Sequence, residues 1–166
     1  MKQKQKATLR FCLLFISFVL ILFFLAHTQY AHRTVGKYYP AIIASIVAKF
    51  LKFSGFSVSV NGEVITSKSF SMDIIYHCSG IFATIIFISA VVAYPAKISK
   101  KIIGIIFGVP LLAFLNIFRL YIMFIIGMKF PKFFEFFHDF LWQIIFIIFV
   151  IYIWIFWIDH FVEKKS

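Results

Sequence analysis

Long apolar runs constrain this chain more than any other feature of its sequence. Residues 11–30, 74–94, 102–127 and 138–158 are predominantly apolar, and the segments between them carry most of the charged residues. A helix needs about 20 apolar residues to cross the hydrocarbon core of a bilayer, and each run is close to that length. Hydrophobic residues make up 63% of the chain, more than soluble domains contain, so the excess is expected to face lipid. The runs predict an all-α integral membrane protein with about four transmembrane helices, forming a single membrane domain over residues 1–166.

The first run has two interpretations, because a basic segment that includes Lys6 and Arg10 precedes it. A signal peptide and a signal anchor both begin in this way. The apolar stretch that ends at Ala26 is slightly long for a signal peptide and slightly short for a span. We favour an uncleaved anchor, and cleavage near Ala26 is the alternative.

Segment 31–73 follows the first run and is expected to lie outside the membrane. Within it, residues 41–53 place Ser45, Lys49 and Lys52 on one helical face and aliphatic side chains on the other. A helix of this length reaches only about 20 Å, which is too short to cross about 30 Å of hydrocarbon. The pattern therefore predicts a short amphipathic helix at the membrane interface.

A small β-hairpin is predicted over residues 56–70. Apolar and polar residues alternate on both sides of Asn61-Gly62. An Asn-Gly step between two alternating segments is the strongest short-range hairpin signal, because both residues tolerate the positive φ that a tight hairpin turn requires.

The net charge of +11 raises the question of a nucleic-acid partner. Nucleic-acid-binding proteins gather basic residues on a soluble face, whereas here they flank apolar runs, so we expect the charge to meet lipid headgroups and no nucleic acid. Lys and Arg are denser in residues 1–10, 95–101 and 159–166 than in segments 28–73 and 128–137. The positive-inside rule then predicts a protein of the plasma (inner) membrane with both termini in the cytoplasm and the hairpin outside.

Ionisable and nucleophilic side chains inside predicted spans are functional candidates, because burying them in lipid is costly. Cys78, Arg119 and His138 lie toward the same end of three different spans. A cation beside a thiol favours the nucleophilic thiolate, and an imidazole can exchange its proton. A guanidinium can also hold an oxyanion, and burial does not remove its charge. The three residues therefore predict a nucleophilic site near the outer face.

Three further residues are weaker candidates for support of this site. Asn116 lies three positions before Arg119, on the same helical face, where it could orient the guanidinium. Gly80 has no side chain that would block a substrate or a neighbouring helix. Asp139 could orient the imidazole of His138 or simply face the headgroups.

Each candidate also has a structural interpretation. A single Cys in a transmembrane helix is more often a packing residue, Arg119 could pair with Asp139 or with carbonyls, and His138 could only cap a helix. Cys12 and Cys78 form no CxxC pair and lie in separate runs. We therefore expect no zinc site, no disulfide framework and no cofactor.

The ordered residues Cys78-Ser79-Gly80, Asn116 to Arg119 and His138 resemble the signature of the exosortase/archaeosortase family. Larger members have more spans, so the chain is similar to the short forms. The resemblance implies a membrane-embedded cysteine protease and transpeptidase, with Cys78 as the nucleophile, Arg119 as the thiolate or oxyanion stabiliser and His138 as the general acid and base.

The resemblance also implies the substrate and the products. Substrates would be exported proteins that end in a short motif, an apolar helix and a basic cluster. The enzyme would cleave beside the motif, hold the substrate as a thioester and transfer it to an acceptor amine, on a lipid or an envelope polymer.

Two alternatives remain open. One is a hydrolase of the same architecture that uses water as the acceptor. The other is a non-catalytic multi-pass subunit that assembles with a partner through small-residue faces such as Gly104, Gly108 and Gly127. A transporter is less favoured, because the chain has no inverted repeat.

Overall fold

The fold is that of a computed structural model, which describes residues 2–163 but not the side chains of residues 2–4, 30–35, 37, 77 and 139. Along the chain the elements are α1 (Lys2–Ala26), α2 (Gln29–Phe53), β1 (Ser59–Asn61), β2 (Val64–Thr66), β3 (Ser71–Asp73), the 3₁₀ turn η1 (Tyr76–Ser79), α3 (Ile81–Ala93), α4 (Ile98–Lys129), η2 (Pro131–Phe133), α5 (Phe134–Phe136), the π-helical turn η3 (Phe137–Leu141), α6 (Trp142–Trp157) and η4 (Ile158–Val162).

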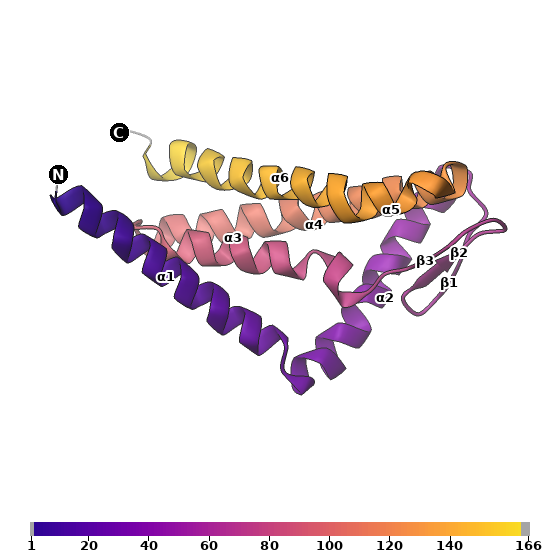
Figure 1. Ribbon diagram of the computed structural model, residues 1–166, viewed down its shortest axis with the longest axis horizontal. Coiled ribbons are helices and arrows are strands. Elements are labelled where there is room, and N and C mark those ends of the chain that lie inside the picture. The colour runs from indigo at the N-terminus through magenta and orange to yellow at the C-terminus, as the bar shows by residue number, and fades with distance from the viewer. Residues whose placement is uncertain (1, 164–166) are drawn as a thin grey trace.

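Helices long and apolar enough to cross a membrane confirm the predicted all-α membrane fold. Within the described part of the chain there are 3 of them, covering Gln5–Ala26, Ile98–Lys129 and Trp142–Val162. Figure 1 shows α3, α4 and α6 running lengthwise together, with α1 beside α3. The start of α1 and the end of α6 lie at one end of the molecule, and the small sheet lies at the other.

The second apolar run differs from the predicted span over residues 74–94. Its α-helix, α3, begins only at Ile81 and has 13 residues, which reach about 20 Å. Gly80 adopts a left-handed conformation with φ of 82°, and a continuous right-handed helix cannot pass through such a residue. The residues before Gly80 instead form the buried turn η1, which holds Cys78. Hydropathy averaged over a span-length window does not detect this break, because the apolar residues on both sides outweigh the four residues of the turn.

The amphipathic helix is present but longer than predicted. The helix α2 covers Gln29–Phe53 and therefore extends well before residue 41. Val47 and Leu51 on its apolar face are fully buried, whereas Lys49 and Lys52 are exposed. This two-sided pattern confirms the interpretation of residues 41–53 as amphipathic.

The predicted hairpin is confirmed by the antiparallel pairing of β1 with β2. Asn61 pairs with Val64 next to the turn, where Gly62 has a φ of 61°. A third strand, β3, pairs with β2 and completes the sheet in the order β1-β2-β3. The sequence did not predict β3, since three residues are too few for an alternation signal.

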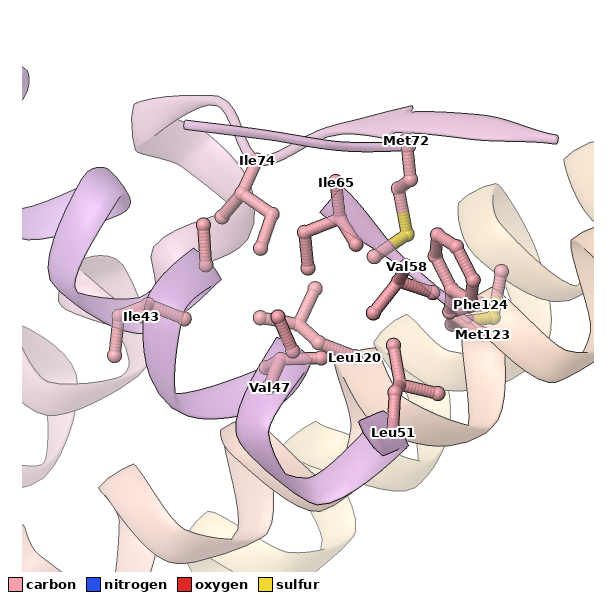
Figure 2. Packing of buried hydrophobic residues seen from close by; sticks show 12 residues of the cluster. Ile43, Val47, Leu51, Val58, Ile65, Met72, Ile74, Leu120, Met123 and Phe124 are labelled. Carbon is pink, nitrogen blue, oxygen red and sulfur yellow. The ribbon is translucent and has the colours of Figure 1, made fainter. Parts of the chain in front are cut away.

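Two apolar clusters hold the elements together. In the first, shown in Figure 2, side chains from α2, the sheet and α4 point into one shared core. Its members include Val47, Leu51, Ile65, Met72 and Phe124. The second cluster joins α3, α4 and α6 through buried residues such as Phe87, Leu112, Phe146, Ile153 and Trp157. Both clusters include residues of α4, which therefore forms the common wall of the molecule.

Three glycines of α4 allow aromatic rings of the same chain to approach closely. A Cβ atom on Gly108 would lie 2.2 Å from Cζ of Phe87, and one on Gly104 would lie 2.4 Å from Nε1 of Trp157. Gly127 is covered in the same way by the ring of Phe70. These small-residue positions are filled from within the chain, so they offer no face to a partner helix.

Candidate active site

Cys78 lies in η1, where several hydrogen bonds fix the chain. The Cys78 amide donates to the carbonyl of Ile75 at 2.9 Å, and the Ser79 hydroxyl donates to the carbonyl of Tyr76 at 2.5 Å. The phenol of Tyr76 donates in turn to the carbonyl of Ala26, the last residue of α1, at 3.3 Å. Cys78 is only 8% exposed. The thiol is thus held in a defined position on a buried turn that α1 helps to support.

His138 lies in the π-helical turn η3, between α5 and α6. Its ring stacks on Phe134, with centroids 5.6 Å apart and an interplanar angle of 16°. Its Nε2 atom lies 3.1 Å from Sγ of Cys78, within hydrogen-bond distance for a sulfur atom. A π-helical turn widens the helix locally, and such turns are frequent at functional sites. This turn presents the imidazole to the thiol.

Arg119 reaches the same place from the C-terminal half of α4. Its charge interacts electrostatically with Cys78, and its side chain is partly buried. Its Nε atom is buried and has no hydrogen-bond partner among the described residues. The three side chains that the sequence singled out therefore converge from η1, α4 and η3.

Asn116 and Gly80 form the wall next to this trio. Asn116 is only 1% exposed, and neither Nδ2 nor Oδ1 has a hydrogen-bond partner in the described part of the protein. A Cβ atom on Gly80 would lie 3.0 Å from Cγ and 3.3 Å from Nδ2 of Asn116. The Asn116 amide thus packs against the backbone two residues after Cys78 and makes no hydrogen bond to Arg119. An unpaired amide in an apolar interior costs about 1–3 kcal/mol, so Asn116 does not contribute to stability through hydrogen bonds of its side chain to the described residues.

No further sequence candidate joins this group among the described side chains. The suggestion that Asp139 orients the imidazole concerns a side chain outside those that the structure describes. Cys12 is exposed on α1. The described residues contain no group of three His, Cys, Asp or Glu side chains that could hold a metal ion.

Three supporting residues were missed by the sequence analysis. Tyr76 and Ser79 anchor η1 on either side of Cys78, and Phe134 stacks on the imidazole. A Tyr and a Ser flanking Cys78 are visible in the sequence, but their role depends on a turn where a helix was predicted.

The arrangement can carry out nucleophilic chemistry. An imidazole in contact with a thiol can accept its proton, and a guanidinium at the same place favours the resulting anion. Low exposure strengthens these electrostatic interactions, because little water screens them. The unpaired Asn116 amide offers one donor side and one acceptor side to an incoming group.

The fold and the site together define a helical membrane protein with a cysteine, a histidine and an arginine gathered near one end of the helices. A profile of the transmembrane exosortases matches residues 5–157, which include all three of these residues. The chain therefore belongs to the transmembrane exosortase family, whose activity is a membrane transpeptidase type of reaction. No curated protein and no solved structure matches it.

Proposed function

We propose that this protein cleaves C-terminal sorting signals of exported proteins through a thioester on Cys78 and transfers the cleaved protein to an acceptor amine. The observation that carries the proposal is the contact of 3.1 Å between Sγ of Cys78 and Nε2 of His138. A packing cysteine needs no such imidazole partner, whereas a nucleophilic one does.

Acylation begins when His138 takes the proton of the Cys78 thiol. The thiolate attacks the carbonyl carbon of the scissile peptide bond, and the negative charge passes to the carbonyl oxygen. Arg119 stabilises this oxyanion, because the guanidinium is charged at every relevant pH and is already positioned before the reaction. His138 then protonates the leaving amine, which departs with the sorting tail. A thioester remains on Cys78.

Deacylation reverses these roles. The amine of the acceptor attacks the thioester carbon, His138 accepts the proton of this amine, and the thiolate leaves. A new amide bond joins the substrate to the acceptor, which is an amine of a lipid or of an envelope polymer. If water attacks instead, the product is a free carboxylate and the protein is a hydrolase.

Asn116 is proposed to position the substrate main chain. Its amide is buried and unpaired beside Gly80, and a peptide group supplies the acceptor and the donor that the amide lacks. Gly80 has no side chain, which lets the Asn116 amide lie close to the backbone that follows Cys78. Asn116 would thus hold the peptide while Cys78, Arg119 and His138 carry out the chemistry.

The substrate is proposed to enter sideways from the bilayer, since its own apolar helix is confined there. The Cys78 turn lies away from the end where α1 begins and α6 ends, as Figure 1 shows for the neighbouring sheet. With both of these helix ends in the cytoplasm of the plasma (inner) membrane, as the basic segments predict, the site faces outward. Exported substrates arrive on that side.

The test follows the processing of a protein from the same genome that ends in a short motif, an apolar helix and a Lys or Arg cluster. With wild type, the cleaved product accumulates. With Cys78→Ala, the substrate stays at full length, whereas the matched variant Cys12→Ala processes it normally because Cys12 is exposed on α1. Normal processing by Cys78→Ala would overturn the mechanism.

Product analysis then distinguishes ligase from hydrolase. Hydroxylamine captures a thioester as a hydroxamate, so mass spectrometry of the released protein reports the intermediate. An acceptor-linked product without hydroxylamine identifies a transpeptidase, and a free carboxylate identifies a hydrolase. A non-catalytic subunit would give neither product, and its Cys78 would react no faster with thiol reagents than Cys12.

A further inference from the structure

A second site lies at the opposite end of the molecule from the small sheet. It is a pocket of about 410 Å³ between α1 and the junction of α3 with α4. Its lining includes Lys6 and Arg10 from α1 and Lys101 from α4. None of the side chains proposed for catalysis contributes to it. The pocket therefore needs an explanation of its own.

The polar part of the pocket is cationic. Its lining contains three basic side chains and no carboxylate. Lys101 already donates one hydrogen bond to the carbonyl of Val92 at 2.6 Å, which leaves two N–H groups of its ammonium group for a ligand. Tyr94 of the lining donates a hydrogen bond to Glu163 at 3.2 Å, but Glu163 does not itself line the pocket. The positive charges of the three basic side chains are therefore not neutralised by any carboxylate in the lining.

The remaining part of the pocket is apolar and firmly built. Phe11, Leu14 and Val92 line it. The ring of Phe11 stacks on Trp154 with centroids 5.8 Å apart and meets the edge of Tyr94 at 6.2 Å. These contacts hold one wall of the pocket in place. A ligand that fills the pocket must therefore combine an anionic group with a hydrocarbon group.

The helix α1 has little protein cover elsewhere. No residue of its apolar window is buried, so lipid must surround most of it. Its contacts with the rest of the protein run mainly along α3. A ligand that bridges Lys6 and Arg10 of α1 to Lys101 of α4 would add a further attachment.

We infer that this pocket binds one anionic phospholipid, whose phosphate lies among Lys6, Arg10 and Lys101 and whose acyl chain lies along Phe11 and Leu14. Basic pockets between transmembrane helices are suited to such headgroups, and an Arg fork matches phosphate oxygens. A free phosphate ion would leave the apolar part empty. The bound lipid fastens α1 to the rest of the protein.

Native mass spectrometry of the purified protein tests this inference. The protein in detergent is mixed with phosphatidylglycerol or with phosphatidylcholine, and the retained lipid adducts are counted. We expect retention of a single phosphatidylglycerol in preference to phosphatidylcholine. Arg10→Gln should lower its affinity about tenfold, the effect of losing one charge-assisted hydrogen bond. Arg10→Lys, which keeps the charge, should lose less.

The matched control is Lys97→Gln, because Lys97 is exposed at the same end but does not line the pocket. It should leave the affinity unchanged. Equal losses in Arg10→Gln and Lys97→Gln would overturn the inference, since they indicate diffuse attraction to the surface. Equal retention of the two lipids, or displacement of phosphatidylglycerol by inorganic phosphate at the same concentration, would also overturn it. Lys6→Gln repeats the test should Arg10→Gln elute as an aggregate.

Discussion

The sulfur of Cys78 lies 3.1 Å from Nε2 of His138, although 60 positions separate the two residues in the chain. The thiol comes from a buried 3₁₀ turn and the imidazole from a π-helical turn. Neither turn belongs to a regular α-helix, so the contact depends on two local departures from helical geometry. Four predictions follow from this site and its surroundings.

His138→Gln should slow substrate cleavage by about 10²–10⁴-fold, the usual contribution of a general acid and base. Glutamine keeps a polar side chain but cannot take the thiol proton. The rate of cleavage and the rate of Cys78 alkylation should both fall. His160→Gln is the matched control, because His160 bonds to the carbonyl of Phe156, four residues earlier in the chain. Equal rates in the two variants would remove His138 from the mechanism.

Arg119→Lys should reduce cleavage by about 10²–10³-fold, the cost of removing one oxyanion-stabilising donor. Lysine keeps the charge but loses the planar fork, so the loss measures geometry and not charge alone. Single-turnover acylation of Cys78, followed by intact mass, is the measurement. If this variant acylates Cys78 at the wild-type rate, a point charge is sufficient and the fork of Arg119 is not needed.

Asn116→Leu should separate stability from activity. Removing a buried amide without partners should keep or raise the melting temperature in detergent, because it removes a desolvation cost of about 1–3 kcal/mol. Cleavage should nevertheless fall, mainly through a higher KM, because the substrate loses its main-chain partner.

Ser89→Ala is the control for Asn116→Leu. Ser89 is fully buried in α3, and its Oγ atom also has no hydrogen-bond partner among the described residues. This variant should gain stability with unchanged KM. If Asn116→Leu also leaves KM unchanged, then Asn116 has no role in substrate binding.

Gly80→Ala should impair cleavage more than it impairs folding. A left-handed conformation costs a residue with a Cβ atom about 1–2 kcal/mol, and the new Cβ would press on Asn116. Gly55→Ala pays the same conformational cost, because Gly55 has a φ of 86°, but no atom lies within 4 Å of its Cβ position. The melting temperature should therefore drop in both variants, but the rate of cleavage should drop only in Gly80→Ala. Equal rates of cleavage by Gly80→Ala and Gly55→Ala would contradict a role of the contact between Gly80 and Asn116 in the reaction.

Much of the fold follows from local patterns. The apolar runs predicted a helical membrane protein, and Asn61-Gly62 predicted the hairpin, because its signal lies in two adjacent residues. The amphipathic face of α2 was visible in its lysines. By contrast, the span predicted from residue 74 became a turn followed by a shorter helix. Hydropathy counts apolar residues, and it does not record that Gly80 reverses the sign of φ.

Cys78, Arg119 and His138 could be named from the sequence because polar groups are rare in apolar runs. Their common depth followed from the order of the spans. The supporting residues could not be named in this way, since Tyr76 and Ser79 are ordinary polar residues until the turn that they brace is known.

The order of residues alone thus predicts that the chain lies in a membrane, and it also singles out three chemically active side chains. Both predictions depend on where polar residues interrupt the apolar runs of the chain. Packing in space specifies the rest. The contact of Cys78 with His138, the unpaired amide of Asn116 and the closure of the α4 glycines by aromatic rings all join residues distant in sequence. No local pattern encodes such contacts, since they arise only when whole helices bury their faces against one another.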